Sequence, residues 1–117
     1  MRLFRFMSKE EYDKYQAGET LVNNTRHQAD TNSTGFCFID EEDYHPAYAY
    51  QFLSGIVDDY ICCVFETEKQ MSIGIGTYAD PYEPETIGVE EYYTSEYNKK
   101  DFTLVESFQY EEIKSWW

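Results

Sequence analysis

Short apolar runs separated by polar turns dominate the chain, and several of them show the period of two that is typical of β-strands. The run at 60–67 is continuously apolar, which predicts a central strand. The segment 70–78 alternates more weakly and holds two glycines, which predicts a strand with a bulge. The predicted strands are 3–7, 34–39, 60–67, 70–78, 89–96 and 102–109. The last two are expected to pair as a hairpin across Asn98, Lys99 and Lys100.

The first helical signal follows the first strand directly. Ser8 and Glu11 form a capping box, in which a hydroxyl and a carboxylate each accept a hydrogen bond at the helix start. Gly18 is a good C-terminal signal, because glycine adopts the left-handed conformation that ends many helices. Residues 9–17 are therefore predicted to be helical. The polar segment 19–32, which is rich in Asn and Thr, is predicted to be a loop.

A second helix is predicted over residues 44–57. Asp43 can cap its N-terminus, and Pro46 is tolerated in its first turn. Apolar residues recur in it at helical spacing, so one face should pack on the sheet. The predicted order is β-α-β-α-β-β-β-β. At 117 residues, this order describes one compact α+β domain, 1–117, with two helices and a mostly antiparallel sheet.

Charge narrows the classes of partner. The chain carries 9 basic and 23 acidic side chains, for a formal charge of −14. Direct binding to nucleic acid or to anionic membrane is not expected, because phosphate contacts need clustered Lys and Arg. Residues 40–98 hold fourteen acids and one base, Lys69, whereas residues 1–39 are balanced. This distribution is explained either by a solvated surface or by an anionic interface, and the twelve interleaved tyrosines favour the interface.

Cysteine and histidine positions predict no metal or redox site. The three cysteines, Cys37, Cys62 and Cys63, include no C-x-x-C pair, and the adjacent two should point to opposite faces of a strand. Neither His27 nor His45 has a partner at metal-ligand or triad spacing. The short apolar start is interrupted by arginines, and no apolar stretch approaches the length of a membrane span. We therefore expect a cytoplasmic protein with reduced thiols.

Arg5 on the first strand, Ser33 and Thr34 at the mouth of the second strand, and a late-strand glutamate follow one another along the chain. This succession resembles the mono-ADP-ribosyltransferase family. The resemblance implies an ADP-ribosyltransferase-like fold with NAD as cofactor. It further implies that Arg5 grips the NAD phosphate, Ser33 orients the nicotinamide side, and Glu91 stabilises the ribosyl cation. The same residues also have structural explanations: Arg5 can pair with a nearby carboxylate, and Ser33 can cap a turn.

In size and composition, the chain resembles small acidic phage anti-defence proteins, including anti-CRISPR proteins and other DNA mimics. The resemblance implies an inhibitor in the bacterial host cytosol that docks on the basic nucleic-acid-binding surface of a partner such as a nuclease. Carboxylates spaced like phosphates would occupy the partner's channel, and tyrosines would anchor the complex. The candidate binding residues are Asp40, Glu41, Glu42, Asp43, Asp58, Asp59, Glu83, Glu85 and Glu90.

The sequence leaves three functions open. The inhibitory binding protein is the preferred hypothesis, and it needs no cofactor. The NAD-dependent transferase, with Arg5, Ser33 and Glu91 as its cleft residues, is the alternative. An acidic accessory module without enzymatic activity is the third. At most one of Glu90 and Glu91 can face a cleft, because neighbouring residues of a strand point to opposite faces.

Overall fold

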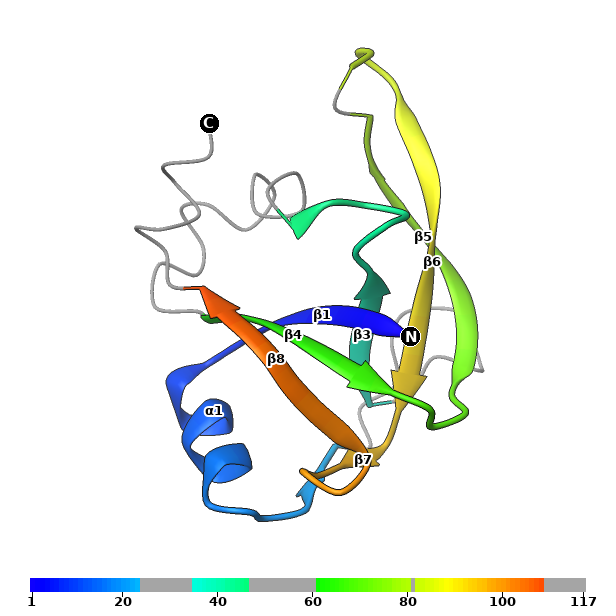
Figure 1. Cartoon of the computed structure of the whole chain (residues 1–117). Coiled ribbons are helices and arrows are strands. Elements are labelled where there is room, and N and C mark those ends of the chain that lie inside the picture. The colour runs from blue at the N-terminus through cyan, green and yellow to red at the C-terminus, as the bar shows by residue number, and fades with distance from the viewer. Residues whose placement is uncertain (24–34, 47–60, 81, 109–117) are drawn as a thin grey trace.

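A computed structural model describes residues 1–23, 35–46, 61–80 and 82–108 (Figure 1). Its elements are β1 (Arg2–Met7), α1 (Lys9–Gln16), β2 (Leu21–Val22), β3 (Phe36–Asp40), β4 (Ile61–Thr67), β5 (Ser72–Ala79), β6 (Thr86–Thr94), β7 (Glu96–Tyr97) and β8 (Phe102–Phe108). Six strands form one sheet in the order β5-β6-β3-β1-β4-β8, and β2 pairs with β7. Every strand pair is antiparallel. The predicted class, a small domain dominated by an antiparallel sheet, is confirmed.

The first helix is confirmed together with its cap. Ser8 Oγ accepts a hydrogen bond from the backbone N–H of Glu11 at 3.2 Å, and α1 begins at Lys9. Gly18 follows the helix with φ +83°, the left-handed conformation expected of the residue that ends it. This is the one helix that the described ranges contain in full. The second predicted helix, 44–57, lies outside the described residues from position 47 onward.

The predicted hairpin between the last two long strands is wrong. β6 pairs with β5 and β3, whereas β8 pairs with β4 at the opposite edge of the sheet. The chain is diverted after β6, because Tyr97 in β7 pairs with Leu21 in β2 and its side chain is fully buried. Phe102, at the start of β8, packs in the same core as Tyr97, and this packing places β8 beside β4. The tight hairpin is instead β5–β6, across the turn-rich segment 80–85.

The predicted bulge is also misplaced. β5 pairs with β6 in one unbroken register from Ser72 to Ala79. The register shift lies in β4, between Val64 and Phe65, where that strand pairs with β8. One of the two glycines of β5 has a different use: a Cβ at Gly76 would overlap the carboxylate of Glu91 on β6. The weak alternation of this strand therefore reflects close packing rather than a bulge.

The sheet is strongly twisted, and its two faces support two apolar clusters. Figure 1 shows β4 and β8 running diagonally, whereas β3 and β6 stand nearly upright. The helix-side cluster contains residues from β1, α1, β3, β4, β7 and β8 and includes Cys63. The cluster on the opposite face includes Cys62. The adjacent cysteines therefore point to opposite faces, as the sequence predicts, and all three cysteines are free thiols.

Candidate functional site

Arg5, the predicted phosphate clamp, forms a mostly buried ion pair with the helix. Its Nε and Nη2 donate to the two carboxylate oxygens of Glu11, each at 2.8 Å, and the side chains are 18% and 13% exposed. Tyr97 donates its hydroxyl proton to the same carboxylate at 2.5 Å. The guanidinium also lies over the ring of Phe36, 4.9 Å from its centroid. Arg5 therefore joins β1 to α1, as its structural explanation predicts.

Glu91, the predicted catalytic carboxylate, lies in a separate network. Its carboxylate accepts from the Tyr78 hydroxyl at 2.6 Å, the Tyr93 hydroxyl at 2.8 Å and the Cys37 thiol at 3.1 Å. Gly76 leaves the room that this carboxylate occupies. Burial, followed by the Glu91 charge, raises the pKa of the Cys37 thiol, and burial with the Glu91 hydrogen bond raises that of Tyr78. Both donors therefore stay protonated at neutral pH.

The two halves of the predicted NAD cleft lie on opposite faces of the sheet. Arg5 is opposite Cys63, a member of the helix-side cluster. Glu91 is opposite Ile39, a member of the other cluster. Antiparallel partners directly opposite each other share a face, so the sheet separates the arginine from the glutamate. Ser33 and Thr34 lie outside the described residues, and the described part of the chain does not assemble a cleft of this kind.

The acidic run at 40–43 forms a tight turn after β3. Asp40 O accepts from the backbone N–H groups of Asp43 and Tyr44, each at 3.1 Å, and Asp40 Oδ1 accepts from the N–H of Glu42 at 2.9 Å. Glu41 forms an ion pair, since its carboxylate lies 2.5 Å from Arg2 Nε. Four neighbouring acids in the sequence are therefore not equivalent in the structure.

Asp40, Asp43 and Glu90 together form what we call the carboxylate cluster. Ile39 on β3 is opposite Glu91 on β6, so Asp40 and Glu90 are brought together on the other face. Partial desolvation and then the charges of Asp40 and Glu90 raise the pKa of Asp43. Within the described ranges, none of the three has a cationic partner at ion-pair distance. Among the described residues, the cluster is therefore a local concentration of carboxylates without ion-pair partners.

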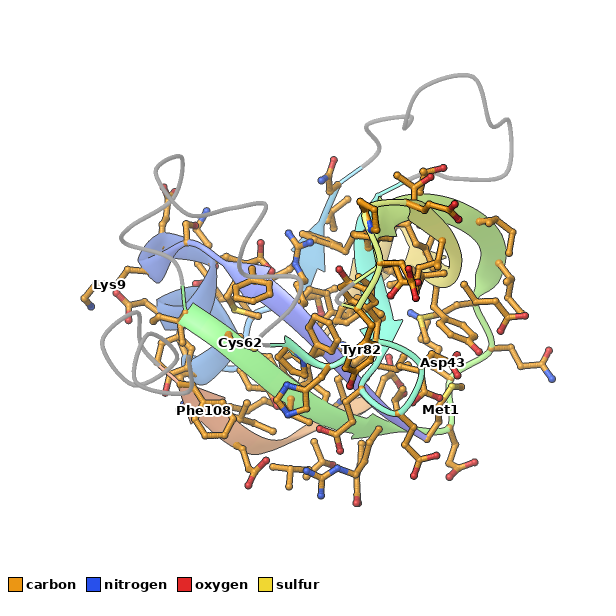
Figure 2. All side chains as sticks on the ribbon, turned by 90° about the horizontal axis from the view of Figure 1, so that it is seen from above. Met1, Lys9, Asp43, Cys62, Tyr82 and Phe108 are labelled. Atoms are coloured by element: carbon orange, nitrogen blue, oxygen red, sulfur yellow. The ribbon has the colours of Figure 1, made fainter. Side chains whose placement is uncertain are left out.

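A groove with a mixed polar and apolar lining, which the sequence did not predict, adjoins this cluster through Tyr92. Its volume is about 310 Å³, and it is lined by Met1, Thr67, Glu68, Lys69, Gln70, Met71, Ile73 and Tyr92. Tyr92 links the groove to the cluster, since its hydroxyl donates to Glu90 at 3.3 Å. Figure 2 shows Met1 and Asp43 on the same side of the molecule, away from Lys9 on the helix. The available sequence signal was the pattern of β5, where Ile73 and Ile75 alternate with glycines.

The remaining predicted binding residues fall into two groups. Glu83 and Glu85 are exposed in the segment that joins β5 to β6. The same segment carries Tyr82, whose side chain is 81% exposed and is labelled in Figure 2. Asp58 and Asp59 lie outside the described residues. The structure thus brings together acids from the turn after β3 and from β6, with further acids at the end of the β5–β6 hairpin.

Comparison with known proteins assigns no family: no family model, no curated protein and no solved structure matches the chain. Among the residues described, no group of three or more His, Cys, Asp or Glu side chains could hold a metal ion. No helix in the described ranges is long and apolar enough to cross a membrane.

Proposed function

We propose that this protein is an inhibitory binding protein that docks its acidic surface on the basic nucleic-acid-binding surface of a partner protein, such as a nuclease. The observation that carries this proposal is the carboxylate cluster of Asp40, Asp43 and Glu90. It comes from two strands and a turn, and within the described ranges none of its carboxylates forms an ion pair. Phage anti-defence proteins of similar size and composition provide the biological setting of the proposal.

Electrostatics explains why such a cluster would serve binding. Like charges held close together repel, and a cationic partner would relieve that repulsion on binding. Partial desolvation and then the charges of Asp40 and Glu90 raise the pKa of Asp43, and the part due to the two charges reflects this repulsion. Solubility requires a net charge of only about 2–8 in a small domain, whereas this chain carries −14. Tyr92, which donates to Glu90, and Tyr82, which precedes Glu83 in the β5–β6 segment, are of the residue type that commonly anchors interfaces.

The proposal predicts fast association that salt weakens, because screened charges steer a partner less effectively. To test it, the purified protein is immobilised and used to capture proteins from a bacterial lysate, with double-stranded DNA added as a competitor. The cluster variant combines Asp40→Asn, Asp43→Lys and Glu90→Lys. Asparagine at position 40 keeps an oxygen that can accept from the N–H of Glu42.

A matched control separates local from total charge. The control variant combines Glu10→Lys, Glu19→Lys and Glu96→Gln, which changes the net charge by the same amount at exposed positions on α1, after it and on β7. We expect the wild type and the control variant to capture the same basic proteins, which DNA and salt release, and the cluster variant to lose them. Capture that DNA does not disturb, or equal loss by both variants, would refute the proposal.

A further inference from the structure

β5 is one of the two edge strands of the sheet and lacks the sequence features that usually protect an edge. It pairs with β6 on one side, and the described part of the chain places no strand on its other side. Edge strands are commonly kept from binding further chains by proline, lysine, a bulge or very short length. The eight residues of β5 include neither proline nor lysine, and their register against β6 is unbroken. Among the described residues, this edge is therefore open to another strand.

The hydrogen bonds show which backbone groups face outward. The N–H of Asp80 donates to Glu85 O at 2.9 Å, next to the pair formed by Ala79 and Thr86. Because of that bond, Ala79 and Thr86 are a non-hydrogen-bonded pair. Hydrogen-bonded and non-hydrogen-bonded pairs alternate along an antiparallel ladder. The outward N–H and C=O groups consequently belong to alternate residues of β5. These residues are Ile73, Ile75, Thr77 and, at the end of the strand, Ala79.

Two of these residues, Ile73 and Ile75, present apolar side chains next to the acids. Ile73 and Ile75 are 53% and 66% exposed, unusually high values for isoleucine. Ile75 is opposite Glu90, and Asp40 on β3 follows Glu90 across the sheet. From the edge inward, the surface therefore changes from apolar to anionic. Lysine and arginine match this order, because their carbon stems cover apolar surface while their charged ends reach beyond it.

We propose that the basic partner binds through an extended segment that adds to the outer edge of β5 as a further strand of the sheet, with Lys or Arg at alternate positions. The proposal rests on the proposed function and specifies how the partner is recognised. Backbone hydrogen bonds at Ile73, Ile75 and Thr77 would supply affinity, and the alternating cations would supply specificity. A second copy of this chain is disfavoured as the occupant, because two chains of charge −14 repel each other.

The test uses a defined probe rather than an unidentified partner. The probe is a synthetic peptide of about ten residues in which Arg and Thr alternate, compared with a peptide of the same composition that has all its arginines first. Amide hydrogen exchange is measured in the wild-type protein with and without each peptide. With the alternating peptide, exchange at Ile73, Ile75 and Thr77 should slow by about tenfold or more. The amides of Gly74 and Gly76, which face β6, report any general change.

Thr77→Pro tests the edge directly. Proline removes the outward N–H of Thr77 without removing a bond to β6, and Thr77→Ala is its control because it keeps that N–H. We expect the proline variant to bind the alternating peptide about fivefold to tenfold more weakly than the alanine variant, as the loss of one hydrogen bond implies. Unchanged exchange at Gly74 and Gly76 in Thr77→Pro verifies that the β5–β6 ladder survives.

The outcomes separate this inference from the proposed function. If the cluster variant loses the peptide while the proline and alanine variants bind equally and the outward amides stay unprotected, the acidic surface binds cations without strand addition. If the cluster variant binds the peptide as tightly as the wild type, the electrostatic basis of the proposed function fails. If neither peptide binds the wild-type protein, or both protect the edge equally, the proposed recognition by alternating cations is wrong.

Discussion

Removing Glu11 should destabilise the protein far more than removing any exposed acid. The Glu11→Leu substitution would leave the Arg5 guanidinium mostly buried without a counter-charge and the Tyr97 hydroxyl without its acceptor. Breaking a buried ion pair from one side costs about 3–5 kcal/mol. Since small domains are stable by about 5–15 kcal/mol, this loss is a large fraction of the free energy of unfolding.

The same physics predicts a partial rescue. Replacing both charges, as in Arg5→Met with Glu11→Leu, removes the stranded guanidinium and is commonly close to neutral for buried pairs. The Tyr97 hydroxyl would still lack its acceptor, which costs about 1–3 kcal/mol. Adding Tyr97→Phe should therefore recover most of the remaining loss. The single variant should therefore be the least stable, the double variant more stable, and the triple variant the most stable of the three. The free energy of unfolding of the triple variant should be close to that of the wild type.

Urea unfolding followed by fluorescence provides the measurement, with slopes compared to verify that unfolding remains two-state. Glu10→Leu is the control, because Glu10 pairs with Lys14 on the exposed side of the same helix and should change stability by about 0.5 kcal/mol or less. A loss below about 1 kcal/mol for Glu11→Leu would show that the pair behaves as a surface pair. A double variant no more stable than the single one would refute the reasoning about the stranded charge.

Three further predictions concern stability. Ser8→Ala should lower the free energy of unfolding by about 1 kcal/mol through loss of the helix cap, and an unchanged urea midpoint would contradict this. Gly35→Ala should cost at least about 3 kcal/mol, because its φ is +97° and a Cβ would overlap the backbone of Asn23 and Thr94. Gly18→Ala, at φ +83° with open space around it, should cost only about 1 kcal/mol, and equal losses would refute the role of packing at Gly35. Burial raises the pKa of the Cys63 thiol to about 12, so the folded state keeps a proton that the unfolded state releases above about pH 8.5. The contribution of Cys63 to stability is therefore fully present below that pH and is lost as the pH rises, by about 2 kcal/mol at pH 10. Urea unfolding under reducing conditions measures this decline, and Cys63→Ala should make it less steep.

Local signals in the sequence predicted α1 and the long strands well, because each depends on residues close together in the chain, but they placed the short strand β2 in a loop. The continuous apolar run of β4 and the cap of α1 are examples. Strand pairing was predicted less well, since it depends on contacts between distant residues. The position of β8 follows from Phe102 and Tyr97 packing in one core, and no pattern within residues 88–110 distinguishes that arrangement from a hairpin.

The candidate residues show the same limit. Alternation correctly implied that Glu90 and Glu91 point to opposite faces, but it gave no partner for either. The partners of Glu91 come from three strands, with Cys37 54 positions away along the chain. Arg5 had a nearby candidate in Glu11, six positions on, across the turn from β1 into α1. Choosing that pair over a phosphate clamp required knowing that both side chains face the same core.

The placement of the bases explains why negative charge accumulates where it does. In the described ranges, both arginines form ion pairs within the fold. Arg2 pairs with Glu41 and Glu106, and Arg5 pairs with Glu11 on α1. Lys9 and Lys14 pair along the helix. Since these cations are committed to elements near β1 and α1, none of the four forms an ion pair with the carboxylate cluster. Added salt should therefore act in opposite directions, screening repulsion within the free protein while weakening its attraction to a basic partner. An acidic surface that served solubility alone would show only the first effect.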